Sequence, residues 1–78
     1  MTYPIRMNSP TDIVRVSNMI ADTGIPMYIS CGNAYIDARS VLGLFPFVGQ
    51  KALLVAPDGM NPDKFMKLVS KLGVSVKG

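Results

Sequence analysis

The hydrophobic residues of this chain change their spacing repeatedly along its 78 residues, and these changes limit the folds that it can adopt. Ile13, Val16 and Ile20 recur at the spacing of one helix face, as do the hydrophobic residues between 65 and 72. Other stretches alternate with a period of two or are continuously apolar, which is typical of strands. The pattern predicts four strands, near residues 2–7, 27–31, 34–37 and 52–57, and three helices, near 10–23, 41–46 and 62–72.

Capping residues indicate where the two long helices begin and end. Ser9-Pro10 and Asn61-Pro62 each place an N-cap residue before a proline at the first helical position. Asp12 stands where an acidic residue completes a capping box. Gly24 and Gly73 follow the two hydrophobic stripes and match left-handed C-terminal caps.

The strand-like stretches indicate how the sheet is built. Pro4 cannot donate a ladder hydrogen bond, so the first strand is predicted at an edge. Gly32-Asn33 matches a two-residue hairpin turn that begins with Gly, and the apolar run 52–56 matches a central strand. The order β-α-β-β-α-β-α predicts a single α+β domain over residues 1–78. We expect an open-faced β-sandwich in which a four-stranded antiparallel sheet carries its three helices on one face.

Composition excludes several ways of stabilising and using such a small domain. A single cysteine, Cys31, rules out an internal disulfide, and the absence of histidine disfavours a zinc site. We therefore expect a hydrophobic core in a reducing, cytoplasmic setting, without a signal peptide or a membrane span. The net charge is +3, and the basic residues near the C-terminus match a solvated helix face better than a nucleic-acid site; they are Lys64, Lys67, Lys71 and Lys77.

One segment resembles a known family. Residues 34–45 read AYIDARSVLGLF: a strand end, a basic residue, Ser40, and a short apolar stretch that contains Gly43. This segment and the element order resemble the histidine-phosphocarrier (HPr) family of the bacterial sugar phosphotransferase system, at the part that holds the family's regulatory serine. The resemblance continues through residues 51–59 into the last helix and covers about two-thirds of the chain. It implies the HPr-like form of the sandwich and a role in that system.

The first third of the chain matches the family only in layout. The resemblance places the family's phosphorylated histidine near Ser9, and the arginine expected just after it is missing. Phosphohistidine chemistry needs an imidazole nitrogen, whereas a phosphorylated serine would be a stable ester. Ser9 is therefore interpreted as a degenerate phosphohistidine position that serves as a helix cap. The chain is similar to histidine-less members such as the catabolite-repression HPr homologue.

Ser40 is the residue most worth testing. The resemblance makes it a candidate for phosphorylation, and its position also suits an N-cap; the two roles are compatible. Arg39 could contact such a phosphate or stay solvated. The resemblance also implies a docking patch for other proteins around the second helix, formed by Arg39, Val41, Leu42, Phe45 and Phe47. The alternative is that Leu44 and Phe47 belong to the core and the others are scattered surface residues.

These observations predict a non-catalytic regulatory protein of the phosphotransferase-system family that binds other proteins, for example a serine kinase or a transcriptional regulator. We expect no enzymatic activity, no cofactor and no metal, because the sequence shows no paired carboxylates, no nucleophile with a base and no glycine-rich phosphate loop. The alternative is an HPr-fold domain recruited as an oligomerising or nucleic-acid-binding module. A salt-dependent shift of nucleic acid would favour that alternative.

Overall fold

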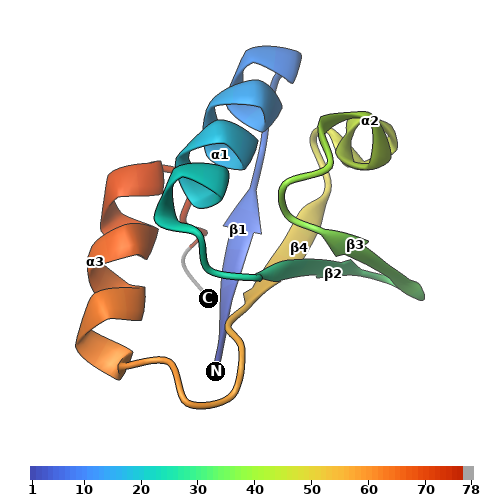
Figure 1. Ribbon diagram of the computed structural model, residues 1–78. Coiled ribbons are helices and arrows are strands. Elements are labelled where there is room, and N and C mark those ends of the chain that lie inside the picture. The colour runs from blue at the N-terminus through green and yellow to red at the C-terminus, as the bar shows by residue number, and fades with distance from the viewer. Residues whose placement is uncertain (77–78) are drawn as a thin grey trace.

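The computed structural model describes residues 1–76 (Figure 1), so Lys77 lies outside the described residues. The secondary structure follows the order β-α-β-β-α-β-α, with one 3-10 turn after the second helix. The predicted α+β class, with four antiparallel strands and three helices, is confirmed. The elements are β1 (Thr2–Arg6), α1 (Pro10–Thr23), β2 (Tyr28–Cys31), β3 (Ala34–Asp37), α2 (Val41–Leu44), η1 (Phe45–Phe47), β4 (Lys51–Val55) and α3 (Pro62–Leu72).

The strands form one antiparallel sheet in the spatial order β1-β4-β2-β3. β4, which is apolar from residue 52 onward, lies between β1 and β2, and β1 lies at an edge, as its Pro4 predicts. The segment after α3 runs along the free side of β1. There the Val76 N–H donates to the Pro4 carbonyl at 3.0 Å, and the Arg6 N–H donates to the Val74 carbonyl at 2.9 Å. This contact, which the sequence pattern does not predict, covers part of the edge.

The ends of the long helices follow their capping residues. The Ser9 hydroxyl accepts a hydrogen bond from the Asp12 N–H at 3.1 Å. The Asn61 side chain accepts two backbone N–H groups in the first turn of α3, at 2.8 and 3.1 Å. Gly24 and Gly73 adopt the left-handed conformation directly after the last helical residues. The predicted bounds 10–23 and 62–72 are therefore confirmed.

The second helix is shorter than the predicted 41–46. α2 ends at Leu44, and the chain continues through the 3-10 turn η1. Pro46 explains the change, because it has no N–H to donate to the Leu42 carbonyl one turn earlier. The strand bounds differ from the prediction by at most two residues, as at β4, which ends at Val55.

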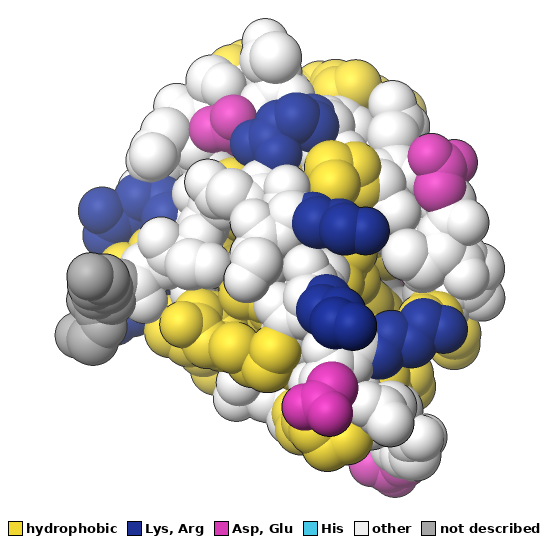
Figure 2. Space-filling model, turned by 90° about the vertical axis from the view of Figure 1, so that its left-hand side faces the viewer, with side chains coloured by type: hydrophobic (Ala, Val, Ile, Leu, Met, Phe, Trp, Pro, Cys, Tyr) yellow, Lys and Arg dark blue, Asp and Glu magenta, His cyan; other side chains and the backbone are white. Residues whose placement is uncertain are grey.

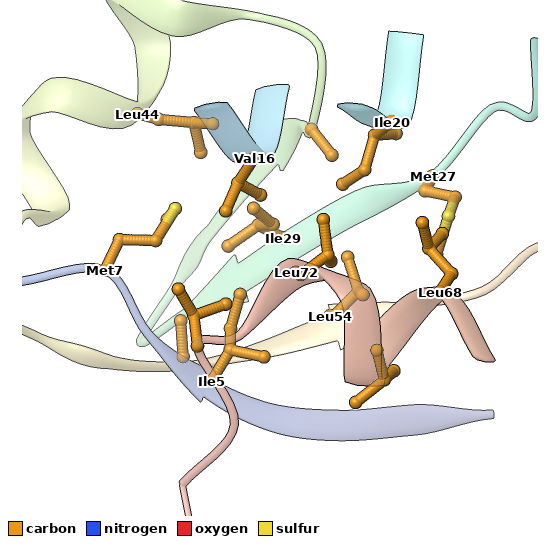
Figure 3. Close-up of a cluster of buried hydrophobic side chains, with 14 of the residues drawn as sticks. Ile5, Met7, Val16, Ile20, Met27, Ile29, Leu44, Leu54, Leu68 and Leu72 are labelled. Carbon is orange, nitrogen blue, oxygen red and sulfur yellow. The ribbon is translucent and has the colours of Figure 1, made fainter. Parts of the chain in front are cut away.

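The core lies between the sheet and the helices on one of its faces (Figure 3). Ile5, Ile29 and Leu54 come from three adjacent strands and are fully buried. They face side chains of the helices, among them Leu72 of α3, while Leu44 of α2 is buried in the same cluster. Full burial of one such aliphatic side chain stabilises the fold by about 1.5–3 kcal/mol. Apolar packing therefore holds all three helices to the sheet.

The opposite face of the sheet carries no helix. Strand register places Leu53, which is 39% exposed, on this face with the aromatic rings of Tyr28 and Tyr35. The two rings stack with their centroids 4.7 Å apart. Arg6 and Lys51 are directly opposite each other in the β1–β4 pair on the same face. The open face thus combines aromatic, aliphatic and basic side chains.

Candidate functional site

Ser40 lies exposed at the start of α2 and caps it. Its hydroxyl accepts a hydrogen bond from the Gly43 N–H at 3.3 Å, and its carbonyl accepts one from the Leu44 N–H at 3.1 Å. The Ser40 N–H donates to the Asp37 carbonyl at 2.9 Å, which connects the cap to the end of β3. The turn between β3 and α2 therefore holds this hydroxyl at the surface.

Gly43 provides the space for this cap. A Cβ at position 43 would lie 2.9 Å from the Ser40 hydroxyl oxygen and 3.0 Å from a methyl carbon of Ile36. Both distances are shorter than ordinary contacts with a Cβ atom. The requirement is steric, because the backbone of Gly43 does not have a positive φ. The glycine of the AYIDARSVLGLF segment thus has a structural role beside Ser40.

Arg39 is paired with Asp37 across the same turn. Its side chain donates to both carboxylate oxygens, at 3.0 and 2.9 Å, and its backbone N–H donates to one of them at 2.9 Å. The Arg39 side-chain hydrogen bonds, followed by the backbone N–H, lower the pKa of Asp37 to about 2. A phosphate on Ser40 would have to compete with this carboxylate for the guanidinium group.

The apolar residues of α2 and η1 differ widely in exposure. Leu44 is fully buried, whereas Leu42 is 81% exposed and Phe45 is 37% exposed. Val41 and Phe47 are partly buried and pack against the core. Of the predicted docking residues, Leu42 and Phe45 therefore offer the most apolar surface to a partner.

Two further hydrophobic side chains are exposed near α2. Val48, which follows η1, is 37% exposed, and Val14 of α1 is 40% exposed. Figure 1 shows α1 between α3 and α2. The buried face of α1 carries Ile13, Val16 and Ile20, and Arg15 contacts α3 through the Leu72 carbonyl. At 3.6 residues per turn, Val14 falls on the other side of that buried face from Arg15, the side where α1 contacts α2. We call the four exposed side chains the α2 patch: Val14, Leu42, Phe45 and Val48.

Sequence reasoning did not identify Val14 or Val48 as site residues. The available signal was that Val14 lies outside the hydrophobic stripe of its helix, which contains Ile13, Val16 and Ile20. An apolar residue off that stripe must either contact another element or face solvent. Only the packing of α2 beside α1 shows which of these applies.

Ser9, at the degenerate phosphohistidine position, is partly buried and is used as a cap. The predicted capping box differs in detail, because the Asp12 carboxylate accepts from the Asn8 N–H, at 3.1 Å, and not from that of Ser9. Arg15 forms an ion pair with Asp12 at 3.1 Å and also donates to the Leu72 carbonyl. The Arg15 hydrogen bond is the main reason that the pKa of Asp12 is lowered. An ionised carboxylate therefore lies next to Ser9, which disfavours an anion there.

Residues 1–76 contain no group of three or more His, Cys, Asp or Glu side chains placed to hold a metal ion. Cys31 is buried, with its sulfur 3.5 Å from the Gln50 side-chain oxygen. Within the same residues, no helix is both long enough and apolar enough to cross a membrane.

Comparison with protein-family models, curated proteins and solved structures finds no match to this chain.

Proposed function

We propose that this chain is a non-catalytic, HPr-like regulatory protein that binds other proteins through the α2 patch. The observation that carries this proposal is that Leu42 and Phe45, in the short helix and turn that follow Ser40, are exposed. Each square ångström of apolar surface that a partner removes from water contributes about 25 cal/mol. The exposed Leu42 and the partly exposed ring of Phe45 can serve as anchors for such a partner.

The layout of the domain supports the HPr-like part of the proposal. The β-α-β-β-α-β-α order and the antiparallel sheet with helices on one face match what the sequence resemblance implies. Ser40, which the resemblance places at the family's regulatory serine, lies exposed at the start of the short second helix and caps it. A cytoplasmic location in a bacterial cell belongs to the same proposal, and Cys31, a buried free thiol, fits a reducing compartment.

Phosphorylation of Ser40 is the proposed means of regulation. A phosphoserine carries roughly −1.5 to −2 charge, and here the charge would lie at the positive end of α2. It would stand beside the exposed Leu42 without entering the core, since Leu44 supplies the buried contact of this helix. A partner could then recognise negative charge and apolar surface together.

The proposed role does not include phosphotransfer through histidine, because the chain has no histidine. Incubation with phosphoenolpyruvate and the general phosphotransferase enzyme, with a histidine-containing HPr as positive control, should leave this protein unlabelled. Acid-labile, alkali-stable label on this protein would contradict the proposal.

A comparative pull-down tests the docking role. Bait proteins carrying Leu42→Asp, Ser40→Asp or Leu53→Asp are compared with the wild type by quantitative mass spectrometry of the captured proteins. Leu53 is the matched control, since it is an exposed leucine on the open face of the sheet. The proposal expects captured proteins that are lost from the Leu42→Asp bait and retained on the Leu53→Asp bait. The amount of these proteins on the Ser40→Asp bait should differ from the amount on the wild type. Identical capture by the Leu42→Asp and Leu53→Asp baits would contradict it.

The open face of the sheet favours a second candidate, nucleic-acid binding. Tyr28 and Tyr35 form a stacked pair there, with Arg6 and Lys51 on the same face. Aromatic rings on a face that also carries cations suit single-stranded nucleic acid. A mobility shift of a single-stranded oligonucleotide that weakens with salt and is lost in Tyr35→Ala would favour this candidate over protein docking.

A further inference from the structure

A groove lies between the C-terminal end of α1 and one flank of α3, on the side of the molecule away from α2. Its volume is about 190 Å³, and its apolar lining comes from Ile25, Met60 and Leu68. Ile25 follows α1, Met60 precedes α3, and Leu68 lies within α3. Figure 2 shows this face of the molecule, where Lys and Arg side chains gather around hydrophobic surface. We call this hollow the α1–α3 groove.

Three lysines of α3 also line the α1–α3 groove: Lys64, Lys67 and Lys71. They are three and four residues apart on one helix, so their charges repel one another. The ion pairs among residues 1–76 join Arg15 with Asp12 and Arg39 with Asp37, and neither pair includes these lysines. No carboxylate lines the groove. An anionic ligand would relieve this repulsion.

We propose that the α1–α3 groove binds an acidic peptide segment of a partner protein, which inserts one aliphatic side chain between the three lysines. A volume of about 190 Å³ is smaller than the roughly 300–1,000 Å³ typical of sites for drug-sized ligands, and it suits a single side chain. Carboxylates on either side of that side chain would pair with the lysines at the rim. This inference does not depend on the α2 patch or on Ser40.

The lining of the groove favours a peptide over two other anionic partners. Its apolar residues are aliphatic, so a nucleic-acid base would find no aromatic ring on which to stack. A lipid surface is bound by hydrophobic side chains that protrude into it. Leu68 instead lines the hollow and is only 8% exposed. Charge and shape together therefore match a peptide with an aliphatic anchor.

A nuclear magnetic resonance titration of the full chain tests this inference. The probe is the peptide acetyl-Glu-Glu-Leu-Glu-Glu-amide, added to the isotope-labelled protein at low ionic strength. Saturable shift changes of the amide signals at Ile25, Met60 and Leu68 are expected. Lys67→Glu should weaken binding roughly tenfold, because the reversal replaces an attraction with a repulsion. The matched control, Lys51→Glu on the open sheet face, should change the affinity less than twofold.

Two further probes separate the anchor from the charge. A peptide with Ser in place of the central Leu should bind at least fivefold more weakly, since it loses the aliphatic contact. Two other anionic probes are tested separately: vesicles that contain phosphatidylglycerol, and a single-stranded oligonucleotide. Each should bind the wild type and Lys67→Glu equally or not at all. The inference is overturned if the peptide causes no saturable shift changes, or if the changes lie outside the groove. It is also overturned if Lys67→Glu and Lys51→Glu reduce the peptide affinity equally. Binding of vesicles or of the oligonucleotide that depends on Lys67 would overturn it as well.

Discussion

Truncation of neighbouring side chains in α2 should reveal which of them face the core. We expect Leu44→Ala to destabilise the domain strongly and Leu42→Ala to have almost no effect, although the two residues are two positions apart in one short helix. Leu44 is fully buried, and Leu42 is 81% exposed. The comparison is internally controlled, because both changes remove the same atoms from the same element.

The expected magnitudes follow from the exposed fractions. Buried Leu→Ala changes cost about 2–5 kcal/mol, so about 3 kcal/mol is expected for Leu44→Ala. Full burial of a leucine is worth about 1.5–3 kcal/mol, and Leu42 buries only about a fifth of its side chain, which gives about 0.5 kcal/mol. Phe45 is 37% exposed, so Phe45→Ala should cost about 2–3 kcal/mol, below the ~3–5 kcal/mol of a fully buried Phe.

Urea unfolding followed by circular dichroism measures these changes in the free energy of unfolding. The slope against urea concentration should stay unchanged, and thermal unfolding should shift by roughly 4–8 °C for each kcal/mol in a domain of this size. A domain of 78 residues is expected to have about 4–12 kcal/mol of stability, so Leu44→Ala should still fold. If Leu42→Ala costs as much as Leu44→Ala, Leu42 faces the core and the α2 patch does not exist.

Ser40→Ala should lower the free energy of unfolding by about 0.5–2 kcal/mol through the lost cap, and Gly43→Ala should also lower it despite the better helix propensity of Ala. In a double-mutant cycle measured by urea unfolding, the double variant should lose less free energy of unfolding than the sum of the two single losses. The reason is that removal of the Ser40 hydroxyl relieves one of the two close contacts of the new methyl group at position 43. Strictly additive losses would argue against the 2.9 Å distance between that methyl position and the Ser40 hydroxyl oxygen. Asp37, with its pKa lowered to about 2, should contribute stability that is present above pH 4 and is lost as the pH falls toward 2. Arg39→Gln should return the carboxyl pKa toward 3.8 in a nuclear magnetic resonance titration, and an unchanged pKa would refute the pairing. A serine kinase that labels the intact wild-type protein should leave Ser40→Ala unlabelled, because Ser40 is the proposed site of phosphorylation.

The sequence by itself determined the parts of this fold that depend on neighbours along the chain. Ser9-Pro10 and Gly24 set the ends of α1, because capping satisfies backbone groups within a few residues of the cap. The hairpin at Gly32-Asn33 and the central place of β4 were also predictable, from a turn signal and from continuous apolarity. Ser40 was recognisable as a cap for the same local reason.

The tertiary structure decided which side chains share a surface. Val14 belongs beside α2 only because α1 packs between α2 and α3, and the groove lysines face Ile25 only because α1 ends beside α3. Likewise, the bridge between the C-terminal segment and β1 depends on where α3 ends relative to the sheet. Such relations join residues distant in sequence, so no local periodicity or cap contains them. They are fixed instead by how the buried faces of the sheet and helices fit together in one core.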